Sequence, residues 1–204
     1  MQCVVPFSGF YESGHDDNLM SALSSICQDE SGDEHPELAD MWQHVPWPAV
    51  YARYAEWYVG ELVDRFPVLQ GLTVLRVESP REYNFTSDVI LGDLPDPQKL
   101  RAACDEDILR DLVKKAFTPC SGFIPFFSAD LDDWPEDLTQ WAPVQLRLLI
   151  EAAMRSSDDW DARDLEPCNL AENARGNGVF ENWIWELLPQ EQRDRIDAAN
   201  ASEN

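Results

Sequence analysis

Apolar residues recur every three or four positions along much of the chain, which is the period of an amphipathic helix. The clearest example follows Pro48, a residue suited to the first turn of a helix, and continues to a stop at Pro67. The same period predicts a helix that is capped by Asp16 or Asp17 and ends near Ile26. We expect further helices over residues 97–117, 137–155 (bent at Pro143), 177–188 and 190–199.

Alternating or β-branched residues predict three strands. Leu72–Glu78 alternates, and Phe85–Leu91 follows it after a short connection, so the two can form an antiparallel pair. Cys3–Phe10 is interrupted by Pro6, which favours a position at a sheet edge. The pattern as a whole predicts an α+β fold with about five helices packed around a small, mostly antiparallel sheet.

The length and composition predict a single folded domain. The chain has 204 residues, of which 44% are hydrophobic, and this is enough to form a sizeable core. We expect one acidic globular domain over residues 1–204, with a disordered tail at 200–204. No apolar run has the length of a membrane span, and the five cysteines are widely spaced without a CxxC pair. These features favour a cytoplasmic protein without disulfides.

The charge is strongly negative and narrows the class of partner. Thirty-nine acidic residues oppose 15 basic ones, which gives a net charge of -24, and residues 1–52 contain no lysine or arginine. Direct binding to nucleic acid or to an anionic membrane is therefore disfavoured, and basic protein surfaces are the expected partners. The alternative is that the acidity serves solubility alone, as in a salt-rich cytoplasm.

The sequence carries no motif of a known catalytic class. P-loop, GxGxxG, HExxH and GxSxG patterns are absent, and the three histidines lack the spacing of a helical metal pair. The carboxylates between Asp130 and Asp137 do not follow the EF-hand pattern. We therefore expect no enzymatic activity, no cofactor and no metal. The alternative is a hydrolase or transferase with an acidic pocket, for which the candidate residues are His15, Arg81, Tyr83 and Asn84.

Two tryptophans point to a further alternative. Trp183 and Trp185 are two positions apart on a predicted helix, so both cannot face its core side. One of them is expected at an interface, which is compatible with an oligomeric scaffold or a homodimer.

Three segments resemble a family of small acidic proteins encoded by phages and prophages. They are Ser79–Asp88 (SPREYNFTSD), Val5–Ser13 and Phe127–Pro135. The family has no assigned activity. The resemblance implies a phage-borne accessory gene that acts in the cytoplasm of a bacterial host cell, and such genes often encode inhibitors of host defence, of the anti-CRISPR or antirestriction type.

Charge and resemblance together predict an inhibitor that binds a basic, nucleic-acid-binding surface of a bacterial defence complex. DNA mimicry is one way in which it could bind. At one charge per ~1.7 Å of duplex, the net charge corresponds to roughly 41 Å of DNA. This is close to the diameter of about 43 Å for a compact domain of this length. The residues predicted to contact the partner are Asp29, Glu30, Asp33, Glu34, Asp132, Asp133, Asp158, Asp159 and Asp161.

Overall fold

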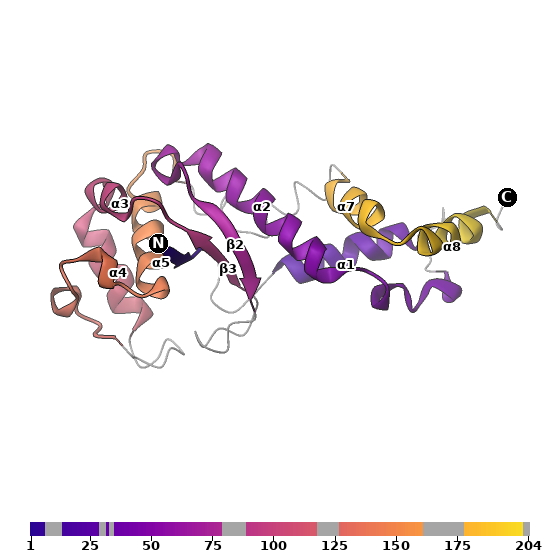
Figure 1. Ribbon diagram of the computed structural model, residues 1–204, viewed down its shortest axis with the longest axis horizontal. Helices are drawn as coiled ribbons and strands as arrows, with labels where there is room; N and C mark the ends of the chain where they lie inside the picture. The colour runs from indigo at the N-terminus through magenta and orange to yellow at the C-terminus, as the bar shows by residue number, and fades with distance from the viewer. Residues whose placement is uncertain are drawn as a thin grey trace. The chain divides into compact units, whose positions relative to one another are not determined.

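The computed structural model of the protein describes residues 1–6, 14–28, 32, 35–78, 89–117, 127–160 and 178–201 (Figure 1). The chain divides into two compact units. The first unit contains Met1–Glu12 and Ala55–Ala162, and the second contains Ser13–Tyr54 and Arg163–Asn204. Each unit therefore combines two stretches that are distant in sequence. No helix in the described ranges has the length and apolar composition that crossing a bilayer requires.

The first unit contains a three-stranded antiparallel sheet. Its strands are β1 (Gln2–Val4), β2 (Thr73–Glu78) and β3 (Val89–Asp93), in the order β1-β3-β2. The predicted antiparallel pairing of the two later strands is confirmed, with Val77 opposite Ile90. The first strand lies at an edge, as predicted, and ends before Pro6. The class of fold is therefore α+β.

Glycine is required at the centre of this sheet. A Cβ atom on Gly92 of β3 would lie 3.0 Å from Cδ1 of Leu72, 3.1 Å from Cγ2 of Val5 and 3.2 Å from the carbonyl oxygen of Thr73. Those distances are shorter than ordinary van der Waals contacts, so any larger residue would push the neighbouring chain segments apart.

The prediction of one continuous helix over residues 97–117 is wrong. The structure has two helices instead, α3 (Pro97–Ala103) and α4 (Glu106–Ala116). Cys104 is extended, and the Asp105 side chain accepts hydrogen bonds from the backbone N–H groups of Asp107 and Ile108. Asp105 thus caps the N-terminus of α4, and a capping aspartate begins a new helix better than it continues an old one.

The helix predicted to start at Asp137 starts instead at Pro143. Residues Leu138–Gln140 form the 3-10 turn η6, and α5 spans Pro143–Arg155. Proline disfavours the helical conformation in the residue before it but fits the first helical position, so Pro143 begins the helix and does not bend it. Gln145 secures this start by accepting a hydrogen bond of 2.8 Å from the backbone N–H of Ala142.

Helix α5 is the central helix of the first unit. All seven residues from Val144 to Ile150 are buried, so the helix is covered on every side. It contacts β1, α3 and α4. The buried set includes Arg147, whose pKa is lowered to about 10 by burial, against the opposing effect of the neighbouring Glu151 carboxylate.

Helix α2 (Trp47–Arg65) closely matches the predicted helix. Its first eight residues belong to the second unit and its last eleven to the first. In the first unit, Val59 and Leu62 are buried, whereas Glu56, Glu61 and Asp64 are exposed. This alternation is the amphipathic pattern that predicts the helix.

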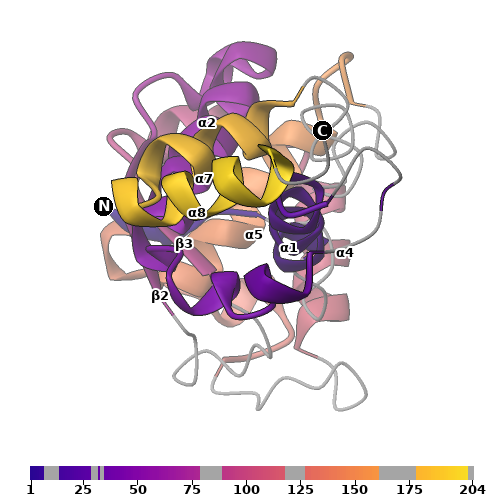
Figure 2. The same ribbon diagram turned by 90° about the vertical axis from the view of Figure 1, so that its right-hand side faces the viewer.

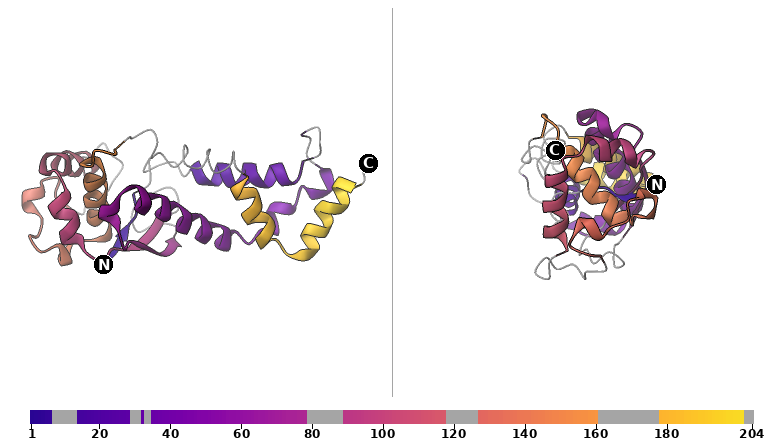
Figure 3. Two further views of the ribbon diagram at one scale, coloured as in Figure 1. Left: turned by 90° about the horizontal axis from the view of Figure 1, so that it is seen from above. Right: turned by 90° about the vertical axis from the view of Figure 1, so that its left-hand side faces the viewer.

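The second unit is helical in its described part. Helices α1 (Gly14–Ile26), α7 (Val179–Leu187) and α8 (Gln190–Ala201) lie where the sequence predicts them, and α1 packs against α7 (Figures 2 and 3). Two 3-10 turns, η1 (Pro36–Leu38) and η2 (Met41–Gln43), complete it. With these helices, the described ranges contain more α-helices than the five predicted.

Polar contacts join η1 and η2 to α8. His35 Nε2 lies 3.0 Å from Oδ1 of Asn200. Arg195 donates hydrogen bonds of 2.7 Å to the carbonyl oxygen of Glu37 and 2.8 Å to the carboxylate of Asp40. The hydrogen bonds from Arg195 and His44 lower the pKa of Asp40.

Candidate functional site

The acidic residues predicted to bind a partner divide into two groups. Five of them lie outside the described residues: Asp29, Glu30, Asp33, Glu34 and Asp161. The other four, Asp132, Asp133, Asp158 and Asp159, are exposed and belong to the first unit. Their pairing with basic groups differs, and it decides how much charge each one offers to a partner.

The Asp132 carboxylate is already neutralised by its own chain. It lies on the 3-10 turn η5 (Leu131–Asp133), and Nη2 of Arg110 donates to it over 2.6 Å. Arg110 also forms a salt bridge of 3.1 Å with Glu106. The hydrogen bond from Arg110 lowers the pKa of Asp132. The neighbouring Asp133 accepts a hydrogen bond of 2.6 Å from the Ser128 hydroxyl. This cluster is therefore partly compensated within the protein.

Asp158 and Asp159 follow the C-terminal end of α5. Asp158 forms no ion pair among the described residues, and the carboxylate of Asp159 forms none either. The backbone of Asp159 is held by Ser157 Oγ, which accepts from its N–H over 3.2 Å, and by Arg65, which donates to its carbonyl oxygen over 3.4 Å. Both carboxylates lie near the C-terminal, negative end of the α5 dipole, where a negative charge is unfavourable. Neither carboxylate therefore stabilises α5.

A further acidic row lies on α2 and was not predicted. Glu56, Glu61 and Asp64 are exposed and form no ion pair within the described part of the chain. They escape a search for acidic runs because residues 57–60 and 62–63, which are apolar or glycine, separate them in sequence. The signal that could have found them is that all three fall on the polar side of the predicted helix. We call these three residues the α2 acidic row.

A groove adjoins the α2 acidic row. It has a volume of about 350 Å³ and lies between α2 and the beginning of β2. Val59, Val63 and Val74 give it an apolar floor, and the carboxyl-bearing residues Glu56 and Asp64 stand at its rim. Its full lining is Glu56, Val59, Gly60, Val63, Asp64, Leu72, Thr73 and Val74.

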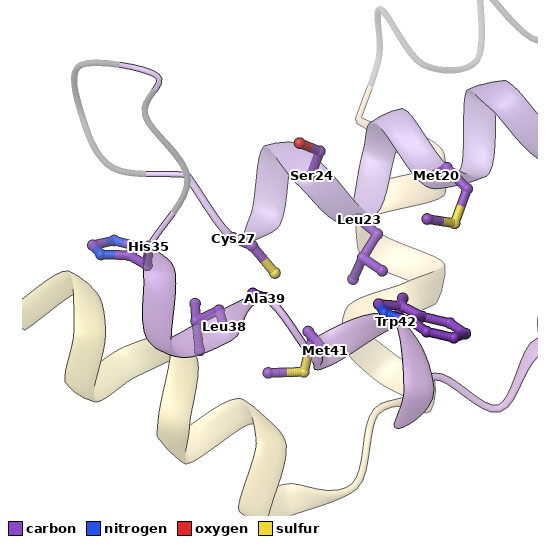
Figure 4. A pocket seen from close by; sticks show the side chains of 9 residues that line it. All are labelled: Met20, Leu23, Ser24, Cys27, His35, Leu38, Ala39, Met41 and Trp42. Carbon is purple, nitrogen blue, oxygen red and sulfur yellow. The ribbon is translucent and has the colours of Figure 1, made fainter.

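A second pocket lies within the second unit (Figure 4). Its volume is about 160 Å³, and α1, η1 and η2 supply its lining. Figure 4 shows the Cys27 sulfur and the side chains of Leu38 and Met41 between these elements. Two side chains that line it, Met20 and Trp42, are 45% and 52% exposed. Apolar residues make up most of the lining, three of its side chains carry sulfur, and Ser24 and His35 add polar groups.

The residues proposed for an acidic catalytic pocket cannot be assembled here. Arg81, Tyr83 and Asn84 lie outside the described residues, as does the side chain of His15. Among the side chains that are described, no group of three or more histidine, cysteine, aspartate or glutamate residues could hold a metal ion. The two described histidine side chains make structural contacts, His35 with Asn200 and His44 with Asp40 at 3.2 Å.

The two tryptophans of α7 have different surroundings. Trp183 is buried, with its ring centroid 5.2 Å from that of Phe180 and 5.4 Å from the guanidinium carbon of Arg53. Trp185 is half-buried. Trp183 therefore belongs to the core of the second unit, and Trp185 is the residue available for the predicted interface.

No family model, curated protein or solved structure matches this chain. The resemblance to phage and prophage proteins therefore stays a prediction.

Proposed function

We propose that the protein binds a basic surface of a nucleic-acid-binding protein, where its carboxylates take the place of phosphates. The observation that carries this proposal is the α2 acidic row, which is exposed and has no basic partner among the described residues. Charges that their own protein does not pair are available to pair with another, and they speed association with a surface of opposite sign.

The distribution of charge supports the same proposal. The first unit contains 22 carboxylates and ten basic residues, and the second contains 17 and five. Each unit therefore carries 12 net negative charges. The described arginines of the second unit are already engaged, Arg53 with Glu186, Arg195 with Asp40 and Arg193 with the Gln190 side chain. Neither unit has an excess of cations that could neutralise the other.

The spacing of the α2 acidic row is comparable to that of nucleic-acid phosphates. Glu56 and Asp64 are eight residues apart, which is about 12 Å along a helix axis. One strand of B-DNA presents a phosphate every ~3.4 Å, or roughly three to four over the same length. With Glu61 between them, the row presents three. A bacterial nuclease or CRISPR complex is the target class that the sequence predicts, and its DNA channel has the basic character required.

The test is a capture experiment with matched variants. Tagged protein is incubated with bacterial lysate at about 50 mM and about 500 mM salt, a range over which screening becomes strong. The captured proteins are identified by mass and then challenged with duplex DNA. We expect a basic nucleic-acid-binding protein that is released by high salt and displaced by DNA.

A pair of triple variants separates local from overall charge. E56Q/E61Q/D64N neutralises the α2 acidic row, and D107N/E136Q/D197N neutralises three exposed carboxylates elsewhere with the same change in net charge. At up to about 1 kcal/mol for each exposed charge, the first variant should bind roughly tenfold or more weakly and the second within about threefold of wild type. Capture that is indifferent to salt and DNA, or an equal loss in both variants, would contradict the proposal.

A further inference from the structure

The outer edge of β2 has no partner strand among the described residues. In the order β1-β3-β2, the strand pairs with β3 on one side, and no hydrogen bond from the described residues reaches its other side. In an antiparallel strand, alternate residues direct their N–H and C=O groups away from the paired neighbour. The pairing register of β2 with β3 shifts between Val74 and Arg76, so this alternation is interrupted at Leu75. On either side of Leu75, β2 presents backbone donors and acceptors that an added strand could use.

The groove next to α2 reaches this edge at the beginning of β2. Consecutive strand residues point to opposite faces of a sheet, and yet both Thr73 and Val74 line the groove. A groove that touches both cannot lie over one face alone, so it passes the side of the strand. The other side is occupied by β3, where Thr73 is opposite Asp93 and Val74 opposite Gly92.

At one position on its groove side, α2 carries no side chain. Gly60 lies on α2 between Glu56 and Asp64, and a Cβ atom added there would meet nothing within 4 Å. A glycine within a helix costs about 1 kcal/mol relative to alanine, and nothing in the packing requires it here. Its effect is to leave space between α2 and β2 at the centre of the groove.

The charge at the rim selects the kind of occupant. Glu56 and Asp64 are the charged residues that line the groove, both are acidic, and its floor is apolar. An extended segment could pair with the edge of β2 and place valine- or threonine-like side chains on the apolar floor. Lysine or arginine side chains of the same segment could then pair with the two carboxylates at the rim of the groove. The 12 Å between the two carboxyl-bearing positions corresponds to about four residues of a strand, which places the two basic residues at i and i+4.

We propose that β2 binds an extended basic segment of the partner as an added fourth strand, with its side chains in the α2–β2 groove. This inference rests on the proposed function, since it states how the basic partner is held. The backbone of β2 supplies the hydrogen bonds, and Glu56 and Asp64 supply the selectivity for basic side chains.

The test uses the full chain, labelled with ¹⁵N, and a synthetic eight-residue peptide. The peptide alternates threonine and valine and has lysine at its second and sixth positions. We expect it to shift the backbone amide signals of Thr73–Glu78 and of Gly60 in NMR spectra. A second peptide of the same sequence carries N-methyl groups on alternate residues, which removes strand pairing but keeps the charge. Because two lost hydrogen bonds are equivalent to about a tenfold change in affinity, it should bind at least tenfold more weakly.

A protein variant provides an independent check. Gly60→Leu places a side chain in open space within the groove, so the fold is retained and the peptide should bind at least about tenfold more weakly, whereas Gly60→Ala should have a smaller effect. Absence of shifts in β2 at millimolar peptide, or equal binding of the N-methylated peptide, overturns the added strand. If the N-methylated peptide binds equally well, the added strand is ruled out but the charge-based proposal stands. If E56Q/E61Q/D64N leaves capture of basic proteins unchanged while the peptide still pairs with β2, the charge-based proposal fails instead.

Discussion

The hydroxyl of Tyr58 donates a hydrogen bond of 3.1 Å to the carbonyl oxygen of Pro6, and both groups are buried. The bond ties α2 to the chain just beyond β1, and burial raises the pKa of Tyr58 above its ordinary value. Tyr58→Phe leaves the Pro6 carbonyl without this donor. We expect it to lower the free energy of unfolding by about 1 kcal/mol, measured by urea denaturation. A variant as stable as wild type would show that the bond contributes nothing.

The cap at Asp105 determines where α4 begins. Asp105→Ala removes the acceptor for two backbone N–H groups, so we expect a loss of about 1 kcal/mol in the free energy of unfolding. Asp105→Asn is the control, because its amide oxygen can accept hydrogen bonds from the same N–H groups. Equal losses in the two variants would contradict a capping role.

The pair formed by Asp132 and Arg110 should make stability depend on pH. The pKa of Asp132 is lower in the folded state than in the unfolded state, so the folded protein binds fewer protons around that pKa. The stabilisation is fully present above about pH 4 and is lost as the pH falls through the folded pKa. Asp132→Asn should therefore differ from wild type at pH 7 in urea unfolding and converge with it as the pH falls below the folded pKa of Asp132. Glu136→Gln is the control for loss of charge alone, because Glu136 is exposed and forms no ion pair among the described residues.

Two cysteines should react slowly in the folded protein. Burial raises the pKa of Cys3 to about 12 and that of Cys104 to about 11. Because the thiolate is the reactive form, at pH 8 only about 0.1% of Cys104 is reactive, compared with roughly a quarter of an ordinary thiol. We expect little alkylation by iodoacetamide at these two sites and rapid alkylation in urea, followed by mass spectrometry. Rapid modification of Cys104 in the native protein would refute its raised pKa.

Two glycines should respond in opposite ways to alanine. Gly60→Ala adds a methyl group in open space on a helix, so we expect a gain of roughly 0.5–1 kcal/mol in the free energy of unfolding. Gly71 has φ +92°, and its Cβ would lie 2.9 Å from Cγ of Pro95, so Gly71→Ala should destabilise the protein. Thermal unfolding of the two variants compares them directly. A Gly60→Ala variant less stable than wild type would show that the helix needs glycine there.

The sequence predicts the elements well where one physical signal dominates. The apolar period of α2 and the alternation in β2 give both elements within about one residue. The errors fall where a local capping interaction competes with the helical period. Asp105 interrupts one predicted helix and Pro143 delays another, because side-chain capping and the restriction before proline act over one or two residues. A pattern of apolar residues that extends over a whole helix does not reveal these local effects.

The candidate site was harder to predict for a different reason. Clusters such as Asp132 and Asp133 stand out in the sequence, but the cation that compensates Asp132 is Arg110, which is distant along the chain. The α2 acidic row is inconspicuous in the sequence and uncompensated in space. Whether a carboxylate is available to a partner depends on the basic residues that the fold brings to it, and the order of residues does not state this.

An exposed strand edge can pair with the same edge of another copy of a protein, and the outer edge of β2 has no partner strand among the described residues. At neutral pH, two copies would bring like-charged surfaces together, with 24 net negative charges on each. Mutual repulsion thus protects the edge from self-association while leaving it accessible to cations. This protection weakens as the pH approaches the isoelectric point near 4.2. Acidification should therefore favour self-association of the protein through β2.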